Sequence, residues 1–359
     1  MLHYSTHKQH TRENQMKLFE PTGVHVLVDG QFGSTGKGAL ASFLAREAVE
    51  NGAIKNFQGI ITNGGPNSGH TSYWGHAKII LKQLPTFAVQ AHLMGYTIPV
   101  FLSAGAVINA DVLRFEASTY PNIPIHVHPQ SAVIHDMDLV LEQGGPIRDI
   151  ASTQSGTGSA IASKVYRRPG AVAKNSLRDM PRNVVISDIR PKVDSHAYFM
   201  EVSQGFSLGI NSSFYPHVTS RECTVMQGIT DARIPPRHVA KTYMCVRTYP
   251  IRVGNLGSHS SGDWYEDQRE TSWDELGIDP ELTTVTQRVR RVATFSMQQY
   301  CDAVYANDPD FVAVNFLNYL NEKNQAELMD SLMEARAIFT KNHGFLGGFG
   351  PHASQWRVL

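Results

Sequence analysis

The stretch DGQFGSTGKGALASFLA, residues 29–45, has the glycine spacing and the lysine of a loop that binds phosphate. Four glycines fall within nine residues, and they allow a backbone to approach a ligand closely. Backbone N–H groups and the Lys37 ammonium would then neutralise phosphate charge. The common pattern is G-x-x-x-x-G-K-[ST], but Gly38 stands here in place of the hydroxyl that binds magnesium. The loop therefore predicts phosphate chemistry of an unusual kind.

A second polar stretch, TNGGPNSGHT at 62–71, contains Asn67 and His70 among three glycines. Histidine exchanges protons near neutral pH, and glycine-rich turns after strands are common ligand sites. A lone histidine is more often structural, but this position favours a proton donor or a transition-state contact.

Three further stretches carry groups that bind anions or bases. Residues 151–168, ASTQSGTGSAIASKVYRR, combine hydroxyls with a Lys-Arg-Arg set, which is typical of a phosphate cradle or of an ordinary loop. In EVSQGFSLGINSSFYPHVTS, residues 201–220, Gln204 is placed to read a base edge and Thr219 to bind phosphate. The stretch TTVTQRVRR, residues 283–291, has three arginines within four residues, which suit a carboxylate substrate, several phosphates or a solvated face.

The elements that must position these residues follow from the apolar runs. Short apolar runs predict buried strands, and apolar residues at helical spacing predict helices between them. Strands that alternate with helices indicate an α/β fold: a mostly parallel central sheet flanked by helices, with a P-loop-like nucleotide-binding loop and small substrate-binding subdomains. Residues 254–285 are rich in Gly, Ser and Asp and predict a mobile loop. The predicted strands are 24–30, 59–65, 99–109, 198–205 and 310–320, and the predicted helices are 37–52, 111–119 and 322–340.

The bulk composition narrows the class of protein. Lys plus Arg equals Asp plus Glu at 32 each, so no strong field favours nucleic acid or a membrane surface as partner. The three cysteines are far apart, which disfavours a disulfide framework or a zinc site and indicates a reducing compartment. No apolar run reaches the roughly 18 residues of a membrane helix. We expect a cytoplasmic protein with a flexible extension at 1–22 and a single domain at 23–359.

Taken together and in this order, these stretches resemble the adenylosuccinate synthetase family. GQFGSTGKG is similar to the family's G-x-Q-W-G-D-E-G-K-G, and GGPNSGHT to its G-G-x-N-A-G-H-T. EVSQG followed by YPHVTS is similar to E-G-A-Q-G followed by Y-P-x-V-T-S, RVG at 252–254 matches R-V-G, and TQRVRR resembles T-x-R-x-R-R. The resemblance runs from about residue 24 to GFGP at 348–351. Five matches in order are far more specific than any one.

The resemblance implies a reaction in two steps. A nucleotide first donates its γ-phosphoryl group to the 6-oxygen of a purine monophosphate, which converts a poor leaving group into a good one. The amine of L-aspartate then displaces that phosphate and gives an N6-succinyl purine. Such chemistry needs Mg²⁺, in-line positioning and neutralisation of charge. The family also implies a homodimer.

The resemblance further implies roles for single residues. It assigns catalysis to Ser34, Lys37, His70 and Gln204, and Mg²⁺ binding to Ser34 and Gly69. The donor nucleotide is expected at Gly33, Thr35, Gly36, Gly38, Thr71, Asn315, Asn318, Gly348, Gly350 and Pro351. The purine monophosphate is expected at Ser34, Asn67, Ser152, Thr153, Arg167 (from across a dimer), Gln204, Thr219, Arg252, Val253 and Gly254. Aspartate is expected at Thr284, Val285, Thr286, Gln287, Arg288 and Arg290.

The first departure from the family is Ser34, which stands where the family has the Asp that removes the N1 proton of inosinate. A hydroxyl cannot replace a carboxylate base, so the substrate differs or the protein is inactive. A phage-encoded branch that resembles this family has Ser here and makes N6-succinyl-2-amino-2′-deoxyadenylate from dGMP. The smaller Ser34 leaves room for a 2-amino group, which predicts dGMP as substrate. The base for N1 stays open between the substrate aspartate and water.

The second departure is NFLN at 315–318, where the family reads the guanine of GTP with T-K-x-D. Asn318 offers a donor and an acceptor, which complement adenine, whereas a carboxylate would accept two bonds from guanine. The prediction is a C–N ligase that uses ATP or dATP, in the host cytoplasm if the chain is phage-encoded. One alternative is an ordinary adenylosuccinate synthetase that uses inosinate and GTP. The other is an inactive nucleotide-binding protein.

Overall fold

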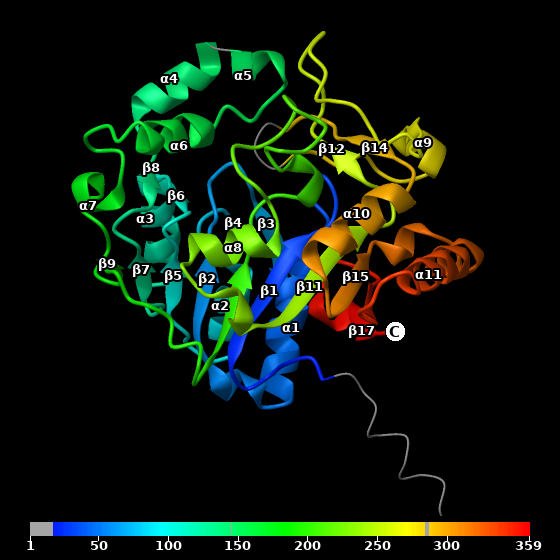
Figure 1. Ribbon diagram of the computed structural model, residues 1–359, viewed down its shortest axis with the longest axis horizontal. Coiled ribbons are helices and arrows are strands. Elements are labelled where there is room, and N and C mark those ends of the chain that lie inside the picture. Colours follow the sequence, from blue (N-terminus) through cyan, green and yellow to red (C-terminus); the bar gives the residue numbers. More distant parts are fainter. Residues whose placement is uncertain (1–16, 145, 284–286) are drawn as a thin grey trace, which may run out of the picture.

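A ten-stranded sheet runs through the molecule in the order β17-β16-β15-β11-β1-β10-β2-β5-β7-β9. The computed structural model describes residues 17–144, 146–283 and 287–359. Neighbouring strands of this sheet are parallel, except that β16 and β17 are antiparallel. Helices cover both faces of the sheet (Figure 1). The predicted mostly parallel α/β fold is confirmed.

The strands of the large sheet include every predicted one, with different ends. The run 99–109 is split into two short strands because a turn, closed by the bond from the Ala106 amide to the Ser103 carbonyl (2.9 Å), lies between them. The run 310–320 leaves the sheet after residue 315. The strands are β1 Gly23–Asp29, β2 Phe57–Thr62, β5 Val100–Leu102, β7 Ile125–Val127, β9 Val184–Ile186, β10 Ala197–Glu201, β11 Val239–Arg247, β15 Phe311–Asn315, β16 Gly344–Gly348 and β17 Trp356–Val358.

Smaller sheets and short helices lie beyond the ends of the strands of the large sheet. Helices α4 to α6 lie on one side of this end of the molecule, and strands β12 and β14 lie on the other side (Figure 1). The small sheets are β12 Ile251–Arg252 with β14 Arg291–Ala293 and β13 Glu270–Thr271, β3 His70–Trp74 with β4 Ala77–Leu81, and β6 Val107–Ile108 with β8 Ala132–Val133. The stretch 254–285 was predicted as a mobile loop, but it contains strand β13 and helix α9, so this prediction is wrong there. The Ser272 hydroxyl caps α9 by accepting from the Glu275 amide (3.1 Å).

The predicted helices are present as α1, α3 and α11. Asn109 caps α3 through bonds from the amides of Asp111 and Val112 (both 3.1 Å). The α-helices are α1 Lys37–Glu50, α2 Thr86–Leu93, α3 Ala110–Thr119, α4 Asp136–Gly144, α5 Pro146–Asp149, α6 Thr157–Val165, α7 Ala173–Ser176, α8 Val225–Asp231, α9 Trp273–Leu276, α10 Met297–Asn307 and α11 Glu322–Arg336. None of the helices in the described ranges is long and apolar enough to cross a membrane.

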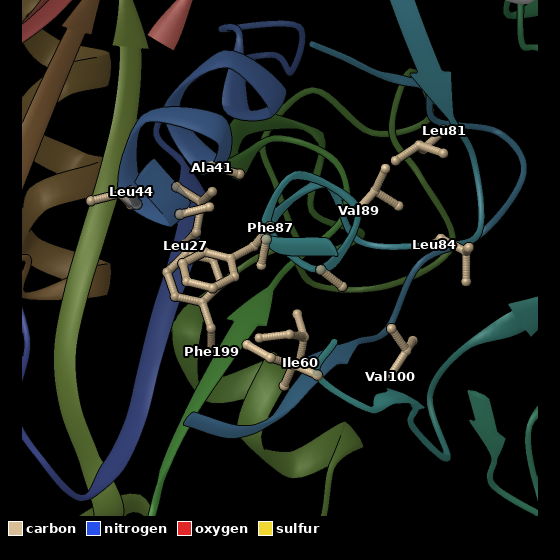
Figure 2. Close-up of a cluster of buried hydrophobic side chains, with 14 of the residues drawn as sticks. Leu27, Ala41, Leu44, Ile60, Leu81, Leu84, Phe87, Val89, Val100 and Phe199 are labelled. Atoms are coloured by element: carbon tan, nitrogen blue, oxygen red, sulfur yellow. The ribbon is translucent and has the colours of Figure 1, made fainter. Parts of the chain in front are cut away.

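The larger hydrophobic core fixes the two ends of the glycine loop. Leu27 of β1 packs beside Ala41 and Leu44 of α1 and beside Phe87 of α2 (Figure 2). The Phe87 ring stacks on Phe199 of β10 at 4.4 Å between centroids. Because β1 and α1 are both held in this core, the loop that joins them has a defined path.

The chain before β1 also belongs to this core. Leu18 and Phe19 are buried, and the Tyr243 hydroxyl donates to the Leu18 carbonyl. The Phe19 ring meets Phe57 edge-on at 5.6 Å. The flexible extension predicted for 1–22 is therefore wrong for this segment, since its apolar side chains are packed; residues 1–16 lie outside the described residues.

Candidate functional site

A cavity of about 980 Å³ lies where the parallel strands end. Loops after β1, β2, β10, β11 and β15 line it, as expected for an open α/β sheet, and α4 to α6 close one side. All five predicted stretches meet there. The predicted residues in its lining are Gly33, Ser34, Thr35, Gly36, Lys37, Gly38, Asn67, Gly69, His70, Thr71, Ser152, Thr153, Gln204, Thr219, Arg252, Val253, Arg290, Asn315, Asn318, Gly350 and Pro351.

Some predicted residues do not line the cavity. Arg167 is exposed just after α6, and Arg288 donates to the Ala151 carbonyl (3.0 Å) behind the wall. A methyl group on Gly348 would lie 2.5 Å from the amide oxygen of Asn315, so the main chain at this glycine packs closely against a residue that lines the cavity. Gly254 and Gln287 are also outside the lining, and Thr284, Val285 and Thr286 lie outside the described residues.

Asp29, at the end of β1, organises the glycine loop from below. Its buried carboxylate accepts from the amides of Gln31 (2.9 Å), Gly33 (3.3 Å) and Thr35 (3.4 Å), and from the Thr35 hydroxyl (2.6 Å). It also pairs with the Lys37 ammonium at 3.1 Å. The sequence prediction missed Asp29; the signal was an acidic residue at the end of a buried strand, directly before a glycine loop.

The loop enters α1 at a glycine that no larger residue could replace without a clash. Gly36 is the residue before α1, with φ of 89°, and an added methyl group would lie 2.0 Å from the Asn315 amide nitrogen. That nitrogen donates to the Thr35 carbonyl at 3.0 Å and ties the loop to β15. No side chain in the described part of the chain caps α1. The amides of Ala39 and Leu40 donate to the Gly36 carbonyl (2.9 and 3.2 Å), whereas those of Lys37 and Gly38, which line the cavity, have no acceptor within the helix and suit an anion.

Lys37 is almost fully buried beneath the cavity. Its ammonium donates to the Gln204 carbonyl at 2.8 Å besides pairing with Asp29. The charge is therefore fixed between the glycine loop and the loop after β10. An added methyl group on Gly205 would lie 2.0 Å from the Gly33 amide nitrogen, so these two loops touch.

His70, the first residue of β3, lines the cavity and is held by a buried carboxylate. Its Nδ1 lies 3.2 Å from a carboxylate oxygen of the fully buried Glu201, and its buried Nε2 has no hydrogen-bond partner among the described residues. The other Glu201 oxygen accepts from the Phe87 amide at 2.7 Å. This arrangement fixes the orientation of the ring, because the buried carboxylate holds Nδ1 in place. Glu201 was not predicted, although it opens the EVSQG stretch.

Gln204 offers an amide group that the protein leaves to a ligand. The residue has a left-handed backbone with φ of 69°, and its buried Nε2 has no acceptor in the described part of the chain. A buried donor without a partner costs free energy, and a bound base edge would relieve that cost. The side chain lines the cavity together with His70 and Ser34.

The hydroxyl-rich stretch forms the wall by α6. Thr153, Ser155 and Thr157 are linked by hydroxyl contacts of 3.1 and 3.3 Å. The amides of Gly156 (2.7 Å) and Gly158 (2.8 Å) at the start of α6 donate to the Glu142 carboxylate. Because Glu142 already satisfies these amides, hydroxyl groups remain as the groups that this wall offers to a phosphate.

Arg252 supports the wall from the side of β12. Its guanidinium donates to the carbonyls of His217 (3.0 Å) and Asp263 (3.2 Å), and it lies over the Phe32 ring at 4.4 Å from the centroid. Burial lowers the pKa of Arg252 to about 10, and it remains charged at neutral pH. Among the described residues, the Arg252 side chain donates hydrogen bonds to main-chain carbonyls, so its expected contact with the purine monophosphate stays a prediction.

The fold and the cavity define a nucleotide-binding α/β protein, and comparisons with known proteins make the assignment specific. The sequence model of the adenylosuccinate synthetase family matches residues 177–330. The N6-succino-2-amino-2′-deoxyadenylate synthase of Salmonella phage PMBT28 is 34% identical over 86% of this chain and 89% of that protein. The synthase of the same name from Vibrio phage phiVC8 is 33% identical over 91% and 96%.

A solved structure agrees with these relatives. The cyanophage S-2L succinoaminodeoxyadenylate synthetase, bound to dGMP and to dATP as an energy donor, matches with a TM-score of 0.82 and 31% identity. The match covers 94% of this chain and 95% of that one. The chain belongs to the adenylosuccinate synthetase family, which confirms the resemblance seen in its motifs.

Proposed function

We propose that this protein is a ligase that condenses dGMP with L-aspartate, driven by ATP or dATP, to give N6-succinyl-2-amino-2′-deoxyadenylate. The observation that carries the proposal is Ser34, an exposed hydroxyl in the cavity lining where the family's loop has a carboxylate. The names of the phage relatives and the ligands of the cyanophage structure support the same substrate. The proposed product would serve the synthesis of 2-aminoadenine DNA in the cytoplasm of a phage-infected host.

The proposed reaction begins with phosphoryl transfer. The 6-oxygen of dGMP attacks the γ-phosphorus, the nucleoside diphosphate leaves, and the N1 proton departs to the substrate aspartate or to water. The α1 amides and Lys37 are the groups that neutralise charge on the transferred phosphoryl group. His70 is our proposed contact at the 6-oxygen, since it lines the cavity and its Nε2 has no partner among the described residues while Glu201 holds Nδ1. Gln204 contacts the purine.

In the second step the aspartate amine attacks C6. The C6–O bond breaks and phosphate leaves with the former 6-oxygen, so that His70 can stabilise or protonate the departing oxygen. Arg290 lines the cavity and is our proposed carboxylate partner, with Arg288 and residues 284–287 assigned by resemblance. Burial lowers the pKa of Arg290 to about 10, which leaves it charged for this role.

Mg²⁺ is the proposed cofactor, and the residues present fit it. Ser34 and Gly69, which the resemblance assigns to Mg²⁺, both line this cavity, and a hydroxyl and a main-chain carbonyl are oxygen ligands of the kind that Mg²⁺ takes. Within the described ranges no group of three or more His, Cys, Asp or Glu side chains could hold a metal ion. Mg²⁺ is commonly held by few protein oxygens together with substrate phosphates and water, as in kinases. When bound, it would neutralise charge on the transferring phosphoryl group.

The dGMP phosphate is assigned to the Thr153 hydroxyl of the α6 wall, to Asn67 and Thr219 of the loops after β2 and β10, and to Arg167 from a second copy of the chain. Asn67, Thr153 and Thr219 line the cavity. Arg167 does not, and it follows the exposed apolar side chains of Val165 and Tyr166 (65% and 73% exposed). A homodimer that covers this exposed corner would bring Arg167 to the partner's cavity, which is why we propose it.

The donor base is assigned to the wall after β15. Asn318 lines the cavity beside Phe316 and Tyr319, whose rings lie 5.1 Å apart. The Asn318 amide complements adenine, so ATP or dATP is the proposed donor. Donor competition tests this assignment, because GTP should not support turnover as well as either adenine nucleotide.

The test of the function is a product assay. The protein is incubated with L-aspartate, Mg²⁺, ATP or dATP, and either dGMP or inosinate, and the products are identified by mass spectrometry. A succinylated product from dGMP is expected, and a Lys37→Met variant serves as the inactive control. Product from inosinate alone would make the protein an ordinary adenylosuccinate synthetase. No product with either purine would favour an inactive nucleotide-binding protein.

A further inference from the structure

Arg247, at the end of β11, lies fully buried beside the cavity wall. It is the largest of the side chains that are fully buried among the described residues. Its guanidinium donates to the Ser34 carbonyl at 3.0 Å and lies over the Phe316 ring at 4.1 Å from the centroid. It therefore holds the glycine loop against the wall assigned to the donor base.

Glu281 is the acidic partner of Arg247. Two guanidinium nitrogens reach its two carboxylate oxygens, one at 3.2 Å, which is the bidentate geometry of a strong charge-assisted pair. The Tyr319 hydroxyl donates to the same carboxylate at 3.2 Å. The main-chain carbonyl of Glu281 accepts from the Arg290 amide at 2.8 Å. Glu281 thus connects the glycine loop, through Arg247, to the segment that carries the proposed aspartate-binding arginine.

Glu281 is not a substitute for the missing loop carboxylate. In the described part of the chain, only Glu142 and Glu281 bring carboxylates to the cavity lining, and Glu142 is held by the α6 amides. Burial raises the pKa of Glu281, but Arg247, Arg290 and the Tyr319 hydrogen bond together outweigh burial and hold the pKa below its ordinary value. A carboxylate with a lowered pKa and both oxygens bonded is a poor proton acceptor.

We infer that Arg247 and Glu281 are a positioning pair that fixes residues 281–283 and 287–290, which include the proposed aspartate-binding Arg290, relative to the phosphate-binding loop. The inference rests on the proposed function, which places aspartate at Arg290. Its physical basis is that one buried guanidinium bonds the Ser34 carbonyl and the Glu281 carboxylate at once, so a change in one loop displaces the other. Aspartate affinity therefore depends on the pair more than purine or donor affinity does.

The test compares two Glu→Gln variants. Glu281→Gln keeps the shape of the side chain and removes its charge. The matched control is Glu270→Gln, because Glu270 also forms a bidentate pair with an arginine, Arg291 (2.6 Å to Nε), but lies outside the cavity lining. We expect KM for aspartate to rise about tenfold in Glu281→Gln, within the usual range of coupling between sites, while KM for dGMP and dATP changes by less than about twofold. The control should leave all three unchanged.

A double-mutant cycle with Arg247→Lys adds a second readout. The two substitutions should be strongly non-additive in aspartate KM, because either one breaks the same pair. Additive effects, an equal rise in all three KM values, or unchanged aspartate KM in active Glu281→Gln would overturn the inference.

Hydrogen exchange separates this inference from the proposed function. Wild-type turnover with dGMP or inosinate tests the function itself. If the wild type makes no product, amide exchange still reports the pair: Glu281→Gln should exchange faster than Glu270→Gln both in the loop at 33–37 and at 287–290. Faster exchange in only one of the two segments, or in neither, would mean that the pair does not connect them.

Discussion

Asp29→Asn is expected to destabilise the protein although the change replaces only an oxygen with an NH₂ group. The side chains of Asp29 and Lys37 are 0% and 5% exposed, and their ion pair spans 3.1 Å. Removing one partner of a buried pair typically costs about 3–5 kcal/mol, since the other charge stays buried. Asparagine retains one acceptor for the loop amides, which places the expected loss near the lower end, about 3 kcal/mol.

Urea unfolding followed by circular dichroism measures this loss. The control is Asp111→Asn. The Asp111 carboxylate pairs with Arg114 at 2.6 Å, and the Asp111 side chain is 90% exposed. Exposed pairs contribute up to about 1 kcal/mol, so the control should cost much less. In the Lys37→Met background, Asp29→Asn should cost less than it does alone, because no buried ammonium remains. If Asp29→Asn costs no more than the control, the account of a loop held by a buried pair is wrong.

Three further results are expected. Gly36→Ala should weaken dATP binding and lower the free energy of unfolding more than Gly52→Ala does. Both glycines have left-handed backbones, but an added methyl group clashes only at Gly36 and meets nothing within 4 Å at Gly52. Calorimetric titration measures the binding, and urea unfolding measures the stability. Glu201→Gln should lower kcat about tenfold or more with little change in KM for dGMP, since it disturbs the orientation of His70. An unchanged kcat, or a rise in KM for dGMP as large as the fall in kcat, would contradict this role. Burial lowers the pKa of His25 to about 4, so below pH 6.5 the unfolded chain binds a proton that the native state does not, and stability falls as pH falls towards 4. Between pH 7 and pH 5 this contributes about 2 kcal/mol, which should be missing from the pH dependence of unfolding in His25→Gln.

Strong local signals in the sequence predicted the frame of the site. The apolar run before the glycines gave β1, and the helical spacing after Lys37 gave α1. Strand β11 was missed, although it lies beside β1 in the middle of the sheet. Its sequence VAKTYMCVR mixes polar and apolar residues, and the polar Thr242 and Arg247 are buried by tertiary contacts that no local pattern reports.

The sequence by itself determined the chemical character of this protein: a glycine loop with Ser34 in place of a carboxylate, a histidine and a glutamine in later loops, and an arginine-rich segment. These features depend on residue type and on spacing along the chain. The tertiary structure alone decided which groups hold them, because Glu201 is 131 residues from His70 and Arg247 is 213 residues from Ser34. Such partners are set by the order and register of parallel strands, whose ends bring distant loops together, and that order is not written in any local stretch.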